Sequence, residues 1–150
     1  MKTEKLITAL EEQEKNLKDF VECTVSKQKA LVSNNLEELQ QLLIREEKLL
    51  SGLDEQGIQI SSAIGSLAEE NSLKLKSNTV SEFIKAVRQK TEVNLKVIIL
   101  LQDSIRQLVS KAIYTNEQNK ILIQHSRNFI RETILKLVAL NNNQLLDRKI

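Results

Sequence analysis

Apolar residues recur at helical spacing along almost the whole chain. Between residues 3 and 32 they step by alternating fours and threes, which is the pattern of one apolar helix face. The same spacing over 35–67 predicts a second helix. Ser33-Asn34-Asn35 separates the two segments, and because Ser and Asn side chains bond to nearby backbone groups, this triplet predicts a tight turn. The two helices are therefore expected to lie antiparallel, as a hairpin.

The second half of the chain continues with helical patterns of unequal length. Residues 68–78 lose the apolar spacing and are expected to link the hairpin to a short helix over 79–88. A long helix is predicted over 91–140, where there is neither proline nor glycine. Residues 141–150 begin with three asparagines and are expected to be a frayed tail.

Two capping pairs support these helix starts. Asn35 is followed three residues later by Glu38, and Thr79 is followed by Glu82. In such a pair the first side chain accepts a hydrogen bond from the backbone N–H three residues on, which satisfies one of the unpaired donors of the first turn. Helices are therefore expected to start near residues 35 and 79.

Composition favours one fold class. Aromatic residues make up 3% of the chain, proline is absent and there are three glycines, whereas sheets need turn residues and favour aromatic strands. We expect an all-α fold, an elongated antiparallel helical bundle or coiled-coil hairpin, in a single helical domain over 1–150. The longest apolar run, 97–101, is too short to cross a membrane, and the chain opens on an acidic amphipathic segment rather than an apolar leader. These features predict no membrane insertion and a cytoplasmic location.

The predicted long helix is longer than the hairpin against which it can pack. A hairpin arm of about 30 residues is roughly 45 Å long, and the helix over 91–140 is roughly 75 Å long, at 1.5 Å per residue. Roughly 30 Å of its apolar stripe is left without an internal partner on that rise per residue. We expect another chain to use this surface.

The net charge of +2 conceals an asymmetry between the two halves of the chain. Residues 1–70 contain 8 Lys/Arg and 14 Asp/Glu, whereas residues 71–150 contain 14 and 6. The basic residues of the long helix are spread singly, with few aromatic residues among them to stack on bases. Packing of the basic helix beside the acidic hairpin is therefore favoured, and no nucleic-acid partner is expected.

Catalytic and metal chemistry lack the residues they need. The chain has one histidine, His125, and one cysteine, Cys23, which excludes zinc sites built from Cys and His and the paired Glu-x-x-His motifs of di-iron bundles. Acidic pairs such as Glu46-Glu47 are interpreted as solvated helix charges, and Cys23 as a small buried thiol. We predict no enzyme activity, no cofactor and no metal.

Two asparagines stand in the apolar seam of the long helix. Asn116 and Asn119 continue the spacing that precedes them, between Ala112 and Ile123. Polar residues in a packed seam cost stability and usually fix register or partner choice. Their position at a wet rim of the seam would explain the same spacing, so both interpretations stay open.

Three segments, taken in order, resemble the FlgN-type flagellar export chaperone family. Asn34-Asn35-Leu36-Glu37-Glu38-Leu39 and Glu46-Glu47-Lys48-Leu49-Leu50 resemble the family's second-helix opening and its acidic-Lys-Leu-Leu segment. Asn116-Glu117-Gln118-Asn119-Lys120-Ile121-Leu122 resembles its Asn-x-x-Asn motif followed by paired aliphatic residues. The resemblance covers residues 1–140.

This resemblance implies a cytoplasmic chaperone that binds the hook–filament junction proteins, keeps them unassembled and delivers them to the type III export apparatus. The family binds its clients through the C-terminal part of the long helix, which corresponds here to Leu122, Phe129, Ile130, Ile134, Leu137 and Val138. Some members carry a tail tyrosine linked to docking at the export gate. This chain ends with Leu145-Leu146-Asp147-Arg148-Lys149-Ile150, so a gate contact through that tyrosine is not expected.

A rival interpretation needs no client. The same apolar stripe would then pair with a second copy of itself, in a homodimer or a larger bundle, and the protein would be a structural coiled-coil protein. The two interpretations differ in what covers the surplus apolar surface in solution.

Overall fold

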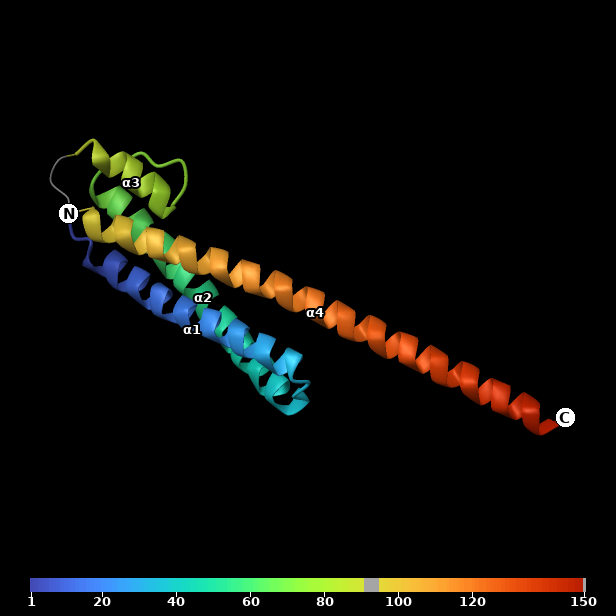
Figure 1. Ribbon diagram of the computed structural model, residues 1–150. Coiled ribbons are helices and arrows are strands. Elements are labelled where there is room, and N and C mark those ends of the chain that lie inside the picture. The colour runs from blue at the N-terminus through green and yellow to red at the C-terminus, as the bar shows by residue number, and fades with distance from the viewer. Residues whose placement is uncertain (91–94, 150) are drawn as a thin grey trace.

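The computed structural model describes residues 1–90 and 95–149, with side chains up to residue 142, and has an all-α fold (Figure 1). Its helices are α1 (Glu4–Val32), α2 (Leu36–Glu70), α3 (Val80–Arg88) and α4 (Lys96–Lys149). No strand is present in these described ranges. The predicted fold class, two long helices followed by a short one and a long one, is confirmed.

The helix bounds depart from the predicted ranges in the second half of the chain. α2 continues to Glu70, so the linker predicted over 68–78 starts only after that residue. α4 continues to Lys149, beyond residue 140, where the long helix was predicted to end. Extending an existing helix adds one hydrogen bond per residue fixed, so three asparagines without a proline or glycine do not stop it. Residues 91–94, the predicted first turn of the long helix, lie outside the described residues.

Both predicted capping pairs are confirmed. Asn35 Oδ1 accepts a hydrogen bond from the Glu38 backbone N–H at 3.2 Å, and Thr79 Oγ1 accepts one from Glu82 at 3.3 Å. Between α1 and α2, Asn34 has a φ of 55°. This left-handed conformation is one that asparagine tolerates better than most residues, because its short polar side chain bonds locally. The Ser-Asn-Asn triplet therefore makes the tight turn that its composition predicts.

α1 is the central helix of the bundle and packs against both α2 and α4. α2 runs antiparallel to α1, whereas α4 runs parallel to it, and α3 lies at the end where α1 begins (Figure 1). The parallel arrangement follows from contacts at two levels: Ile98 near the start of α4 clusters with Leu6 of α1, and Asn119 bonds to Thr24 further along both helices. The hairpin and the first half of α4 thus form a three-helix bundle.

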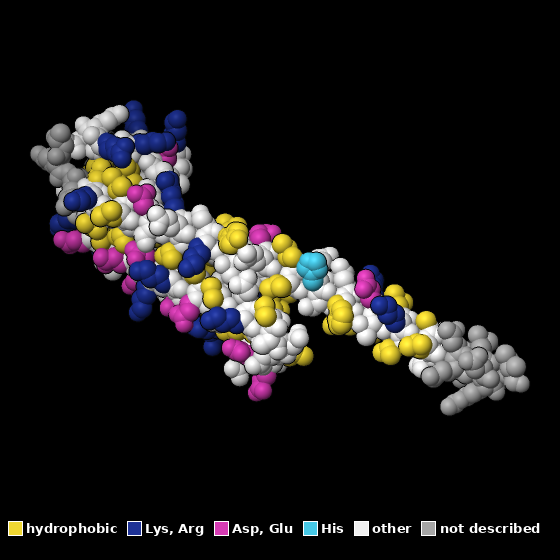
Figure 2. Space-filling model, in the orientation of Figure 1, with side chains coloured by type: hydrophobic (Ala, Val, Ile, Leu, Met, Phe, Trp, Pro, Cys, Tyr) yellow, Lys and Arg dark blue, Asp and Glu magenta, His cyan; other side chains and the backbone are white. Residues whose placement is uncertain are grey.

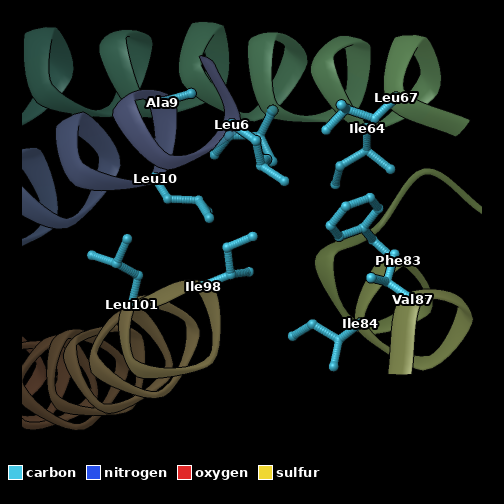
Figure 3. Close-up of a cluster of buried hydrophobic side chains, with 11 residues drawn as sticks. Leu6, Ala9, Leu10, Ile64, Leu67, Phe83, Ile84, Val87, Ile98 and Leu101 are labelled. Atoms are coloured by element: carbon cyan, nitrogen blue, oxygen red, sulfur yellow. The ribbon is translucent and has the colours of Figure 1, made fainter. Parts of the chain in front are cut away.

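The core is thickest at the α3 end, where all four helices contribute side chains (Figure 3). The buried residues of this cluster are Leu6, Ala9, Leu10, Ile60, Ile64, Leu67, Phe83, Ile84, Val87, Ile98 and Leu101. Toward the hairpin turn the buried clusters shrink to Phe20, Val21 and Ala112, and then to Cys23, Ala30 and Leu42, which involve only α1 and α2. Apolar burial therefore holds α4 most strongly near its start.

A charged pair replaces apolar packing near the hairpin turn. Lys27 Nζ lies 3.0 Å from Glu46 Oε2, and the two side chains are only 11% and 13% exposed. The interpretation of Glu46 as a solvated charge is therefore wrong, because α1 places Lys27 directly opposite it. Removing either partner would leave the other charge largely buried and unpaired, which is far more costly than losing an exposed pair.

The predicted burial of the single thiol is confirmed. Cys23 is fully buried, and its Sγ donates to the Leu42 carbonyl at 3.5 Å. Burial raises the pKa of the Cys23 thiol, and the nearby Glu46 carboxylate raises it further. Since the thiolate is the reactive form, both access and charge work against reaction at this residue.

We expect Cys23 to react with dithionitrobenzoate at least about a hundredfold more slowly in the native protein than in denaturant, because reaction must await opening of the core. The absorbance of the released thiolate measures both rates. A single-cysteine control with Cys23→Ala and a new cysteine at the exposed Glu22 should react rapidly in the native state. Equal native and denatured rates for Cys23 would contradict its burial.

Candidate functional site

α4 leaves the hairpin near its middle and continues alone (Figure 1). Leu122 and Ile123 are half-buried, and every side chain from Gln124 to Asn142 is exposed. We call residues 124–142 the projecting segment. The projecting segment is about 29 Å long at 1.5 Å per residue, close to the roughly 30 Å of unpartnered stripe expected from the sequence on the same rise.

The projecting segment carries a large apolar surface. Its exposed large hydrophobic residues are Phe129, Ile130, Ile134, Leu135, Leu137, Val138 and Leu140, with exposed fractions between 49% and 70%. Ile130, Ile134, Leu137 and Val138 are spaced so that they share one helix face. Monomeric proteins rarely leave contiguous apolar surface of this kind uncovered. The arrangement therefore suits contact with another helix.

Positive charge borders this apolar face. Arg127 and Arg131 lie beside Ile130, Ile134 and Leu135 around a shallow hollow on the helix surface. Glu132 is the single acidic residue between 124 and 142, against three basic residues. The apolar residues and their basic neighbours are visible along the projecting segment in Figure 2.

The structure places the six predicted client-binding residues in one continuous part of α4. Phe129, Ile130, Ile134, Leu137 and Val138 are exposed on the projecting segment, whereas Leu122 is half-buried where the hairpin ends. Sequence reasoning missed the exposed Ile121, Leu135 and Leu140. Ile121 and Leu135 stand directly beside predicted residues, and Leu140 stands three positions after Leu137.

Polar side chains meet where α4 leaves the hairpin. Asn119 is 1% exposed, and its Nδ2 donates to the Thr24 carbonyl of α1 at 3.0 Å. Gln28 of α1 donates to Gln118 Oε1 at 3.1 Å. Asn119 therefore lies in the packed seam and not at a wet rim, whereas Asn116 is half-buried.

The seam asparagines are incompletely satisfied. Neither Asn116 Oδ1 nor Asn119 Oδ1, both buried, accepts a hydrogen bond from the described part of the chain. A buried acceptor without a donor costs about 1–3 kcal/mol, so these residues do not serve stability alone.

The described residues offer no obvious metal or membrane site. Among the described side chains, those of residues 1–90 and 95–142, no group of three His, Cys, Asp or Glu converges to hold a metal ion. In the same ranges, none of the helices has the length and hydropathy needed to cross a bilayer. The exposed stripe of α4 is thus the strongest candidate site.

Comparison with known families gives one match over nearly the whole chain. The family described as FlgN protein matches residues 1–146, which include α1, α2, α3 and most of α4. No curated protein and no solved structure matches. On the extent of this match, the chain belongs to the FlgN protein family, a family of flagellar export chaperones.

Proposed function

We propose that this protein is a cytoplasmic chaperone that binds hook–filament junction proteins through the C-terminal part of α4 and keeps them unassembled until export. The observation that carries the proposal is the apolar stripe of the projecting segment, which no part of the described chain covers. The proposed contact residues are Leu122, Phe129, Ile130, Ile134, Leu137 and Val138. The proposed role requires binding and release, and it involves no catalytic step.

The proposed mode of recognition is helix against helix. An amphipathic terminal helix of the client would lay its apolar face along Ile130, Ile134 and Leu137, which are spaced at i, i+4 and i+7. Each well-buried side chain of this size contributes about 1.5–3 kcal/mol, and this gain offsets the cost of association and side-chain ordering. The client's own apolar face is then unavailable for assembly, which is the sense in which the protein acts as a chaperone.

The bundle prepares the projecting segment for this role. Nucleating a helix is costly, whereas extending one is cheap, and the first half of α4 is held helical against α1. The binding half therefore needs no separate nucleation when the client arrives. We propose that the complex of the client with this preformed helix is what is delivered to the export apparatus.

We further propose that Asn119 sets the register of α4 on α1, with Asn116 beside it. A slip of α4 by one turn would break the hydrogen bond from Asn119 to the Thr24 carbonyl and bury its amide without a partner. This polar contact lies where the apolar core is thin, so it discriminates between registers that apolar packing alone leaves close in energy.

The double variant Phe129→Asp plus Leu137→Asp is expected to weaken binding of a hook–filament junction protein by at least about a hundredfold, because two apolar anchors are lost. Isothermal titration calorimetry measures the affinity, and circular dichroism checks that helicity is retained.

The matched control is Ile44→Asp plus Ile58→Asp, since both residues are exposed apolar positions on the hairpin. This variant should bind within about twofold of the wild type, because it changes no proposed contact. Retained affinity in the α4 variant, or an equal loss in both, would refute the proposed site.

The rival structural function predicts a different solution state. We expect light scattering to give a monomer, or a weak dimer that a terminal-helix peptide of the client dissociates, because the stripe is reserved for a client. A dimer that persists at all concentrations, and whose dissociation unfolds the chain, would favour the coiled-coil protein that pairs with itself through the same stripe.

Asn119→Leu is expected to keep or raise stability while α4 loses its single register, because the substitution removes both an unpaired acceptor and the bond to Thr24. Spin labels at Glu22 and Lys120, in a Cys23→Ala background, report the register as a distance distribution. Thr115→Val is the control, since the Thr115 hydroxyl bonds within its own helix, to Lys111. A single unchanged distance in Asn119→Leu would show that apolar packing alone sets the register.

A further inference from the structure

A second feature lies at the opposite end of the molecule from the projecting segment. The connecting residues after α2 and the outer face of α3 enclose an open hollow of about 340 Å³ whose lining includes Lys74, Lys76, Lys85 and Lys90, with Glu82 as its single acidic residue. We call it the lysine hollow. Figure 2 shows dark-blue Lys and Arg side chains gathered over this end of the molecule.

The lysine hollow carries more positive than negative charge. Between residues 71 and 90 there are five Lys/Arg and one Asp/Glu, while Glu69, just before this stretch, lines a neighbouring hollow together with Lys74. The single acidic residue, Glu82, pairs with Lys85 at 3.4 Å. Lys74 and Lys76 are exposed, and neither has an ion-pair partner among the described residues. Clustered like charges of this kind repel one another, so they favour an anionic partner.

These charges stand on a fixed framework. Phe83, Ile84 and Val87 anchor α3 in the main core. Ser81 Oγ accepts hydrogen bonds from Gln102 Nε2 and Arg106 Nη2 of α4, each at 2.9 Å. These contacts hold the backbone of α3 in place before any partner arrives, which lowers the ordering cost of binding.

The segment that connects α2 to α3, residues 71–79, is held near both of its ends. Lys90 Nζ donates to the Asn71 carbonyl at 3.0 Å, which closes one side of the hollow. Asn78 packs on Gly65 so closely that a Cβ there would lie 2.9 Å from Asn78 Nδ2. Asn78 thus lies directly against α2 at Gly65.

The surroundings of the hollow favour a protein as the anionic partner. No large hydrophobic residue between 71 and 90 is exposed, so this face has no apolar wedge to insert into a bilayer. Its single aromatic residue, Phe83, is fully buried and offers no surface for stacking of bases. A flat membrane would touch mainly the rim of a concave site, whereas a peptide can place carboxylates inside it.

We propose that the lysine hollow is a docking site for an acidic segment of a partner protein, separate from the client-binding stripe. The two surfaces lie toward opposite ends of the elongated molecule (Figure 1), so occupation of one leaves the other open. A chaperone built in this way can contact an acidic receptor while it holds its client. The docking proposal does not depend on the identity of the client.

The test uses the full chain and a fluorescently labelled decaglutamate peptide, with binding followed by anisotropy at low salt. Lys74→Glu plus Lys76→Glu should weaken binding by at least about tenfold, because attraction at the hollow becomes repulsion. Lys111→Glu plus Lys120→Glu, two exposed positions on α4, changes the net charge equally and should stay within about twofold. The neutral variant Lys74→Gln plus Lys76→Gln should fall between the wild type and the reversed variant.

Three results would overturn the proposal. The first is no detectable binding of the peptide by the wild type. The second is an equal loss in the hollow variant and the α4 control, which would reduce the effect to net charge. The third is binding to vesicles of phosphatidylglycerol and phosphatidylcholine through the same lysines without binding to the peptide, which would assign the face to a membrane. Thermal unfolding of each variant separates loss of binding from loss of fold. If the variant Lys74→Glu plus Lys76→Glu is unstable, the affinity of Lys74→Gln plus Lys76→Gln decides whether the two lysines bind the peptide.

Discussion

The parallel packing of α4 on α1 is the contact on which the rest of the molecule depends. It joins the second half of the chain to the hairpin. It also determines the residue beyond which α4 no longer contacts the hairpin. α1 ends at Val32, whereas α4 continues to Lys149. Because the two helices run parallel from a common end, the whole difference in their length appears at one place. The projecting segment is the direct consequence of that packing.

The strength of the packing declines along the bundle. At the α3 end, four helices bury one continuous cluster, while near the hairpin turn apolar contacts give way to the Lys27–Glu46 pair and the Asn119–Thr24 hydrogen bond. Polar contacts contribute less net stability than the same volume of apolar packing but depend more strongly on geometry. The bundle is therefore built for stability at one end and for positional precision at the other.

The two ends also differ in the chemistry that they present to partners. The apolar residues between 71 and 90 are drawn into the main core, which leaves lysines on the outside of α3. On the projecting segment no such core exists, so the apolar residues themselves stay exposed. The two proposed binding surfaces, the lysine hollow and the apolar stripe of the projecting segment, fall on opposite sides of this division.

Periodicity, capping pairs and helix length are local properties, so the helices, their caps and the surplus apolar stripe could be predicted from the amino-acid order. The choice of Phe129, Ile134 and Leu137 as contacts came from the resemblance to a known family and not from these local properties. The tertiary structure alone decided that Glu46 faces Lys27, that Asn119 lies in the seam, and that lysines distant from the stripe line one hollow around α3. Those facts depend on which helix faces meet and in what register, and Leu/Glu/Lys helices can meet in many ways of similar energy. Only the packed bundle selects one of them.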